Sequence, residues 1–219
     1  MKIYALLLIG FILSSCSSMS KEECVSANWK EVGIKDGSLG RNVSEFNSYV
    51  KSCAKTSATP DQNAYMSGRR EGLKTYCTIQ KGYERGLRNE TYYGTCVDHN
   101  EKIYLDGRRL GLELYEQERL YTEAAAKVKK MDDDITQVQN EIENLGSAIR
   151  QNGLTTQQRD EKETLISYNK INLSAFKHRR SILQGEAEEA SKNFEALRKK
   201  HAELNYCSNE NCFVKNNVK

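Results

Sequence analysis

The chain has 219 residues, of which 29% are charged, and its 33 basic and 30 acidic side chains leave a formal net charge of +3. Such a balanced charge is not the electrostatic footprint of a nucleic-acid-binding protein, so neither DNA nor RNA is an expected partner. Ten of the 14 glycines lie between Gly33 and Gly111 and only three follow them. This distribution predicts one compact region followed by one extended region.

The amino terminus has the pattern of an export signal. Lys2 precedes an apolar run from Ile3 to Leu13 that is too short to span a bilayer, and two serines then lead to Cys16. A cysteine directly after Leu-Ser-Ser resembles a bacterial lipobox, in which cleavage leaves a lipid-modified cysteine as the first mature residue. We therefore expect a signal peptide over residues 1–15 and lipid attachment at Cys16. The alternative is an ordinary signal peptide with a chance cysteine.

The residues after Cys16 bear on the membrane that holds the anchor. Two serines follow it, without the aspartate that usually retains such lipoproteins at the inner membrane. The resemblance to lipoproteins therefore implies a lipid anchor in the outer membrane, with the chain facing the periplasm. Attached acyl chains hold a protein at a bilayer through their buried methylenes.

Six further cysteines predict a disulfide framework: Cys24, Cys53, Cys77, Cys96, Cys207 and Cys212. An even number in an exported chain favours three disulfides, although six cysteines allow about 15 connectivities. We prefer sequential pairing, Cys24–Cys53, Cys77–Cys96 and Cys207–Cys212, because it suits short helices joined by short loops. A zinc site is the alternative, but there is no Cys-x-x-Cys pair and the three histidines are scattered, so we expect neither a metal nor a cofactor.

The compact region, residues 16–109, is expected to contain short helices near residues 27–36, 43–54, 61–78 and 101–116. Two capping-box patterns, Asn42 with Glu45 and Thr59-Pro60 with Gln62, predict helix starts, with Pro60 at a first helical position. A turn-rich link is expected through Gly82, Gly86 and Gly94.

One sequence pattern is written twice, 39 residues apart, as Tyr-x-x-Gly-Arg-Arg-x-Gly-Leu-x-x-Tyr. The first copy runs from Tyr65 to Tyr76 and the second from Tyr104 to Tyr115, which indicates an internal repeat. Each copy contains Gly-x-x-x-Gly, as do Gly33 to Gly37 and Gly82 to Gly86. Glycines four apart share one helix face and let a second backbone approach closely, so the four pairs predict tight helix packing.

The compact region resembles a known family in its spaced Gly, Tyr and Cys. The matching residues are Glu23, Cys24, Trp29, Asp36, Gly37, Gly40, Tyr49, Cys53, Pro60, Asp61, Tyr65, Gly68, Arg69, Gly72, Leu73, Tyr76, Cys77, Gly82, Gly86, Tyr92 and Cys96. The family comprises uncharacterised proteobacterial lipoproteins that share a domain of unknown function, number 2799. The resemblance covers about residues 20–115 and implies location and fold, but it carries no biochemical activity.

The doubled arginines of the repeat form the one candidate ligand site. Clustered guanidinium groups bind carboxylates or phosphates, so an anion could be held by four side chains: Arg69, Arg70, Arg108 and Arg109. The alternative is that these arginines cover apolar surface and pair with Glu71, Asp106 or Glu113. No nucleophile and base can be assembled. A hydrolase that uses Asp36, Glu71 or His99 is therefore the least favoured function.

The extended region, residues 110–204, has heptad spacing. Apolar residues at alternating steps of three and four run from Leu114 to Ile149, and matching steps run from Ile166 to Leu197. Asn152-Gly153 ends the first helix, and Thr155 with Gln158 makes a capping box for the second. The prediction is an antiparallel hairpin of two helices, about residues 101–150 and 156–204, followed by a tail over residues 205–219 that Cys207–Cys212 would close.

Four apolar residues of the second helix lie beside its main stripe: Leu165, Tyr168, Ile171 and Ile182. Exposed apolar surface of this kind favours a partner for residues 110–204, either a second copy or another envelope protein. The alternative is that these side chains only broaden the seam of the hairpin. The sequence thus predicts an all-α envelope lipoprotein that is structural or adaptor-like and not an enzyme. A module that binds an anionic glycan or phosphate is the second hypothesis.

Overall fold

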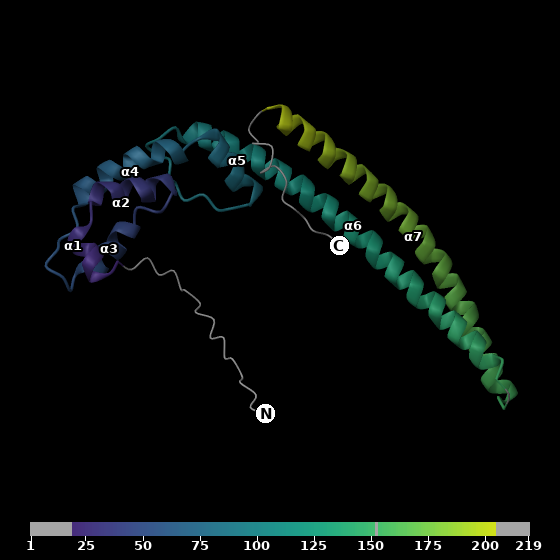
Figure 1. The fold of residues 1–219 in the computed structure, drawn as a ribbon. Coiled ribbons are helices and arrows are strands. Elements are labelled where there is room, and N and C mark those ends of the chain that lie inside the picture. The colour runs from purple at the N-terminus through teal and green to yellow at the C-terminus, as the bar shows by residue number, and fades with distance from the viewer. Residues whose placement is uncertain (1–18, 152, 205–219) are drawn as a thin grey trace, which may run out of the picture. The chain divides into compact units, whose positions relative to one another are not determined.

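The computed structural model describes residues 19–151 and 153–204, which contain helices, turns and loops (Figure 1). Cys16, Cys207, Cys212 and the predicted signal peptide lie outside this range. The helices are α1 (Lys21–Ser26), α2 (Trp29–Ser38), α3 (Glu45–Cys53), α4 (Gln62–Tyr76), α5 (Ile79–Leu87), α6 (Glu101–Ile149) and α7 (Thr156–Glu203). The predicted all-α class is confirmed over the described residues.

The chain divides into two compact units. The first holds α1 to α4 and residues 91–103, and the second holds α5 and the two long helices from residue 104 onward. The sequence places the boundary at residues 109 and 110, because there the glycine-rich pattern gives way to heptads. In the structure α5 groups with the long helices, so glycine-rich sequence occurs in both units.

Three local predictions are wrong. The link expected through Gly82 and Gly86 is the helix α5, in which both glycines are buried. Helix α3 begins after Ser44, and the Asn42 side chain instead accepts a hydrogen bond from the Ser44 amide at 2.9 Å. Helix α4 is capped by Asp61, whose carboxylate accepts from the Ala64 amide at 2.9 Å. Asp61, and not Thr59, is therefore the N-cap residue, and Pro60 lies before the helix.

Two disulfides close the first unit, as sequential pairing predicts. Cys24 pairs with Cys53 and Cys77 with Cys96, and the two α-carbons are 5.6 Å apart in each bridge. Cys24 and Cys53 belong to a buried cluster with the aromatic rings of Trp29, Phe46, Tyr49 and Tyr65. Such crosslinks stabilise small domains whose apolar core is limited.

The four glycine pairs make two helix crossings. In the first unit α2 lies against α4, where a Cβ added at Gly33 would be 2.1 Å from the Tyr65 carbonyl oxygen and one at Gly68 would be 1.9 Å from the Lys30 carbonyl oxygen. In the second unit α5 lies against α6 in the same way. A Cβ added at Gly82 would be 2.0 Å from the Tyr104 carbonyl oxygen. The predicted close packing at Gly-x-x-x-Gly is therefore confirmed.

The two crossings are copies of one helix pair. The Gly33–Gly37 step of α2 corresponds to the Gly82–Gly86 step of α5, as the first Tyr-Gly-Arg-Arg copy on α4 corresponds to the second on α6. The turns after the shorter helices also match, because Gly40 and Asn89 both have positive φ, at 69° and 51°. The repeat is therefore larger than the 39-residue pattern, and each copy is a crossed pair of helices.

The second unit contains the predicted antiparallel hairpin, with α6 and α7 side by side (Figure 1). The predicted capping box at Thr155 and Gln158 is present. Along the seam the rings of Tyr121 and Phe194 stack with centroids 5.9 Å apart, and Arg180 donates to both carboxylate oxygens of Asp132 at 2.8 and 3.3 Å. None of the described helices is long and apolar enough to cross a membrane.

Candidate functional site

A buried carboxylate lies beside the first helix crossing. Asp36 of α2 is 1% exposed, and its Oδ2 accepts hydrogen bonds from the hydroxyls of Tyr49 and Tyr65, each at 2.9 Å. Its Oδ1 accepts from Arg41 at 3.3 Å. Burial and the neighbouring Asp36 raise the pKa of Tyr49 to about 12, and they raise that of Tyr65 as well. Both carboxylate oxygens are therefore occupied by internal donors, which is the arrangement of a structural anchor.

The second helix pair carries an ion pair at the corresponding place, with its charges exchanged. Arg85 of α5 occupies the position of Asp36, and Glu90 that of Arg41, and the two form a salt bridge 2.5 Å long. Glu90 also accepts from Arg88, and these arginines lower its pKa against the opposing effect of burial. Reversal of the charges preserves the pairing, so the ion pair belongs to the repeated architecture.

The first arginine of each Gly-Arg-Arg holds the turn that follows the shorter helix of its own helix pair, α2 or α5. Arg69 donates from Nη2 to the carbonyl oxygen of Arg41 at 3.0 Å, and Arg108 donates to that of Glu90 at 2.7 Å. The second arginines, Arg70 and Arg109, are exposed. The four candidate anion-binding residues are thus divided between the two units, and the first of each pair already has a backbone acceptor.

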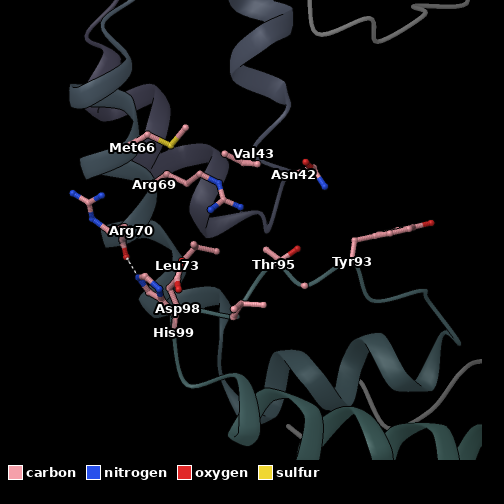
Figure 2. Close-up of a pocket in the computed structure, with 12 residues that line it drawn as sticks. Asn42, Val43, Met66, Arg69, Arg70, Leu73, Tyr93, Thr95, Asp98 and His99 are labelled. Atoms are coloured by element: carbon pink, nitrogen blue, oxygen red, sulfur yellow. Dashed lines mark hydrogen bonds between the residues drawn. The ribbon is translucent and has the colours of Figure 1, made fainter.

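One cavity of the first unit, of about 310 Å³, lies beside Arg69. Figure 2 shows its lining, which combines apolar side chains with Asn42, Asp98 and His99. In that view the guanidinium of Arg69 points toward Val43, whereas that of Arg70 points away from the other lining residues. Arg69 and Arg70 both line this cavity, but only the guanidinium of Arg69 points toward the other lining residues in that view.

The three residues considered for hydrolysis have separate partners. Asp36 is enclosed by tyrosines, and Glu71 forms a half-exposed ion pair with Lys30 at 3.2 Å. His99 donates from Nε2 to the Arg70 carbonyl oxygen at 2.8 Å, and its Nδ1 is buried without a hydrogen-bond partner among the described residues. Among the described residues no group of three His, Cys, Asp or Glu side chains is arranged to hold a metal ion.

A buried histidine packs in the second unit. His201 near the end of α7 is 1% exposed, and its Nδ1 lies 3.2 Å from the Tyr83 hydroxyl of α5. Burial lowers the pKa of His201, and the charge of Lys200 adds to this effect while Glu113 opposes it. The glycine-packed helix α5 covers His201.

The face of α7 that looks away from α6 is the most apolar exposed surface of the hairpin. Tyr168, Ile171 and Ile182 are 61%, 70% and 51% exposed, and Leu165 beside them is 50% exposed. All four side chains are at least half exposed in the single chain, and Tyr168, Ile171 and Ile182 lie on the side of α7 that is far from the seam. Exposed apolar side chains that recur on one face mark interaction sites more often than those scattered singly.

The described residues define a class of protein: all-α, with a disulfide-closed helical unit, two glycine-packed helix pairs and a long helical hairpin. Residues 28–134 match the model of a family described as "Protein of unknown function (DUF2799)". The match confirms the resemblance to the domain of unknown function, number 2799, and it includes both helix pairs and the first part of the hairpin. No curated protein and no solved structure matches the chain.

Proposed function

We propose that this protein is an outer-membrane lipoprotein that faces the periplasm and acts as an adaptor, binding another envelope component through its hairpin. Three features of the sequence support an exported, anchored chain: the short apolar run, Cys16 after Leu-Ser-Ser, and an even number of further cysteines. Four of those cysteines lie at disulfide distance in the first unit. A cytosolic chain would not be expected to keep such bridges.

The exposed apolar face of α7 carries the proposal. Helices α6 and α7 are 49 and 48 residues long and are joined by a short turn, so the hairpin extends on the order of 70 Å at 1.5 Å per residue. The outer face of α6 is polar over the same span, with Lys129, Asp133 and Asn140 among its exposed residues. The outer face of α6 is therefore suited to contact with water, and the exposed face of α7 is suited to contact with an apolar surface of a partner.

The test is in-cell crosslinking of the full chain, followed by identification of the adducts by mass spectrometry. Ile171→Lys places a charge on the apolar face, and because Ile171 is 70% exposed the substitution leaves the hairpin folded. Asn140→Lys adds the same charge to the polar face and is the matched control. Loss of the adducts in Ile171→Lys alone supports the adaptor function. Equal recovery from both variants contradicts it.

A second candidate function rests on the cavity beside Arg69. A guanidinium at the wall of a 310 Å³ space, with Asn42 and His99 nearby, is suited to a small anionic group such as a glycan or phosphate fragment. Saturable binding of inorganic phosphate or a glycan phosphate to the full chain, abolished by Asn42→Ala without a change in helicity, would favour this function. An unchanged adduct pattern in Ile171→Lys would favour it further.

A further inference from the structure

Helix α7 carries a second heptad row on its far side. The row advances in alternating steps of three and four residues, and all of its members are exposed: Tyr168, Ile171, Ala175, His178, Ile182 and Gly185. At 3.6 residues per turn it lies about 150° round the helix from the seam with α6. A heptad row of this kind is the pattern by which one helix packs against another. The spacing of Tyr168, Ile171 and Ile182 therefore suits a helical partner.

The row is complementary to itself when it is reversed. We propose that its occupant is the same row of a second copy, packed antiparallel about a twofold axis between Phe176 and Lys177. This inference rests on the proposed role of the exposed α7 face as an interaction surface, and it assigns a second copy to that surface in place of another envelope component. Residues that face each other across such an axis exchange roles, so each contact occurs twice.

The facing pairs in this register are matched in size. Tyr168, the largest member of the row, faces Gly185 of the second copy, where a Cβ would meet nothing within 4 Å in the single chain. Ile171 faces Ile182, and Ala175 faces His178. The large ring thus enters the space left by the missing side chain, which is the complementarity that packed helices require.

The residues beside the row favour the same arrangement. On one flank three serines recur every seven residues at positions 167, 174 and 181, and they leave room for a close approach. On the other flank the nearest neighbours across the pair are offset by two residues from the layers of the row; they are Arg179 with Asn172 and Glu186 with Leu165, so no two like charges meet. A parallel pair would instead place Gly185 against Gly185 and His178 against His178, which leaves a void at one layer and two titratable rings at another.

The twofold axis lies close to the middle of α7, so the α7 helices of the two copies overlap along most of their length. Because the row contains few large apolar side chains, the pairing is reversible, and it increases with the local concentration of the chain.

The test is sedimentation velocity of the full chain, purified in detergent, over two orders of magnitude in concentration. The wild-type chain is expected to form dimers reversibly. Ile171→Lys and Ile182→Glu each place an unpaired charge in the row and should weaken dimerisation by at least about tenfold. Asn140→Lys is the control and should dimerise as the wild type does.

The double variant Ile171→Lys with Ile182→Glu tests the register. In the antiparallel pair each new lysine faces a new glutamate of the other copy, so dimerisation should return to near the wild-type level. The two residues are eleven apart on one helix, about 16 Å at 1.5 Å per residue, so they cannot pair directly within a chain. A double variant as weak as the single ones, or a wild-type chain that stays monomeric throughout, would overturn the inference. If the wild type is monomeric but loses its cellular adducts in Ile171→Lys, the adaptor function stands with a different partner.

Discussion

The carbonyl oxygen of Tyr65 lies against Gly33 so closely that a Cβ at that glycine would be only 2.1 Å away. Real Cβ atoms do not approach a backbone atom to that distance, so the helices would have to separate. The second unit repeats the relationship between Gly82 and Tyr104, at 2.0 Å. Each crossing therefore depends on glycine at fixed positions, because only a residue without a side chain admits the neighbouring backbone.

The first prediction is that Gly33→Ala destabilises the first unit by about 1–3 kcal/mol or more, because the rigid backbone of α4 cannot yield. Urea unfolding followed by circular dichroism would measure the loss. Gly146→Ala is the control, since its Cβ would lie 3.6 Å from the nearest atom, the end of the flexible Arg150 side chain. That substitution should stabilise α6 by about 0.5–1 kcal/mol. Equal effects at the two positions would contradict the close packing.

A second prediction separates the two arginines of the first repeat. Arg69→Ala should lower the free energy of unfolding by about 1.5–3 kcal/mol, because it removes a charged donor from the Arg41 carbonyl. Arg70→Ala should change stability by less than about 0.5 kcal/mol, because Arg70 is exposed. Urea unfolding of both variants decides the matter. A neutral Arg69→Ala would show that its backbone contact contributes nothing to the fold.

The tyrosines around Asp36 predict a loss of stability at alkaline pH. In the unfolded chain tyrosine ionises near its ordinary pKa of about 10, whereas burial raises the pKa of Tyr49 to about 12 in the folded chain. The unfolded state therefore releases its proton first, and stability falls as the pH rises from about 10 toward 12. Unfolding free energies across this range would measure the decline. Tyr49→Phe should reduce the slope, and Tyr93→Phe, at an exposed position, should not.

His201 predicts a loss of stability on the acid side. Burial lowers the pKa of His201 in the folded chain. Just below the ordinary value of about 6.5, the imidazole is therefore protonated in the unfolded state while it is still neutral in the folded state. Stability of the second unit should therefore fall as the pH drops through 6.5 toward the folded value. The groups that face His201 are Tyr83 of α5, Glu113 of α6 and Lys200 of α7.

Urea unfolding measured between about pH 7.5 and about pH 5.5 spans this transition. His201→Gln should flatten the dependence on pH, whereas His178→Gln, at an exposed position, should retain it. A wild-type chain with equal stability at both ends of the range would show that His201 titrates freely.

The fold was largely predictable because its signals are strong and local. Heptad spacing sets the hairpin, the Thr155 capping box sets the start of α7, and sequential pairing gave both described disulfides. Helix α5 was missed because glycine at positions 82 and 86 opposes a helix on propensity alone. Its stability comes from contact with α6, which a single stretch of sequence does not display. The match between Gly33–Gly37 and Gly82–Gly86 was the available signal.

The candidate site was less predictable. The repeat marked Arg69 and Arg108 as special but did not reveal that each donates to a backbone carbonyl of its own unit. The tyrosine shell of Asp36 was also missed, because Tyr49 and Tyr65 come from two different helices. Three members of the exposed row of α7, Tyr168, Ile171 and Ile182, stand out in the sequence. The far-side position of the row became clear only when the seam with α6 was fixed.

The proposed function requires that the side of α7 that faces away from α6 is the surface through which the hairpin binds its partner. The most direct test is to place a photo-activatable amino acid at position 171 of the full chain, irradiate cells and look for covalent adducts. The same amino acid at position 140, on the polar face of α6, is the comparison. Discrete adducts from position 171 and none from position 140 are expected. Adducts from position 140 alone, or from neither position, would contradict the claim.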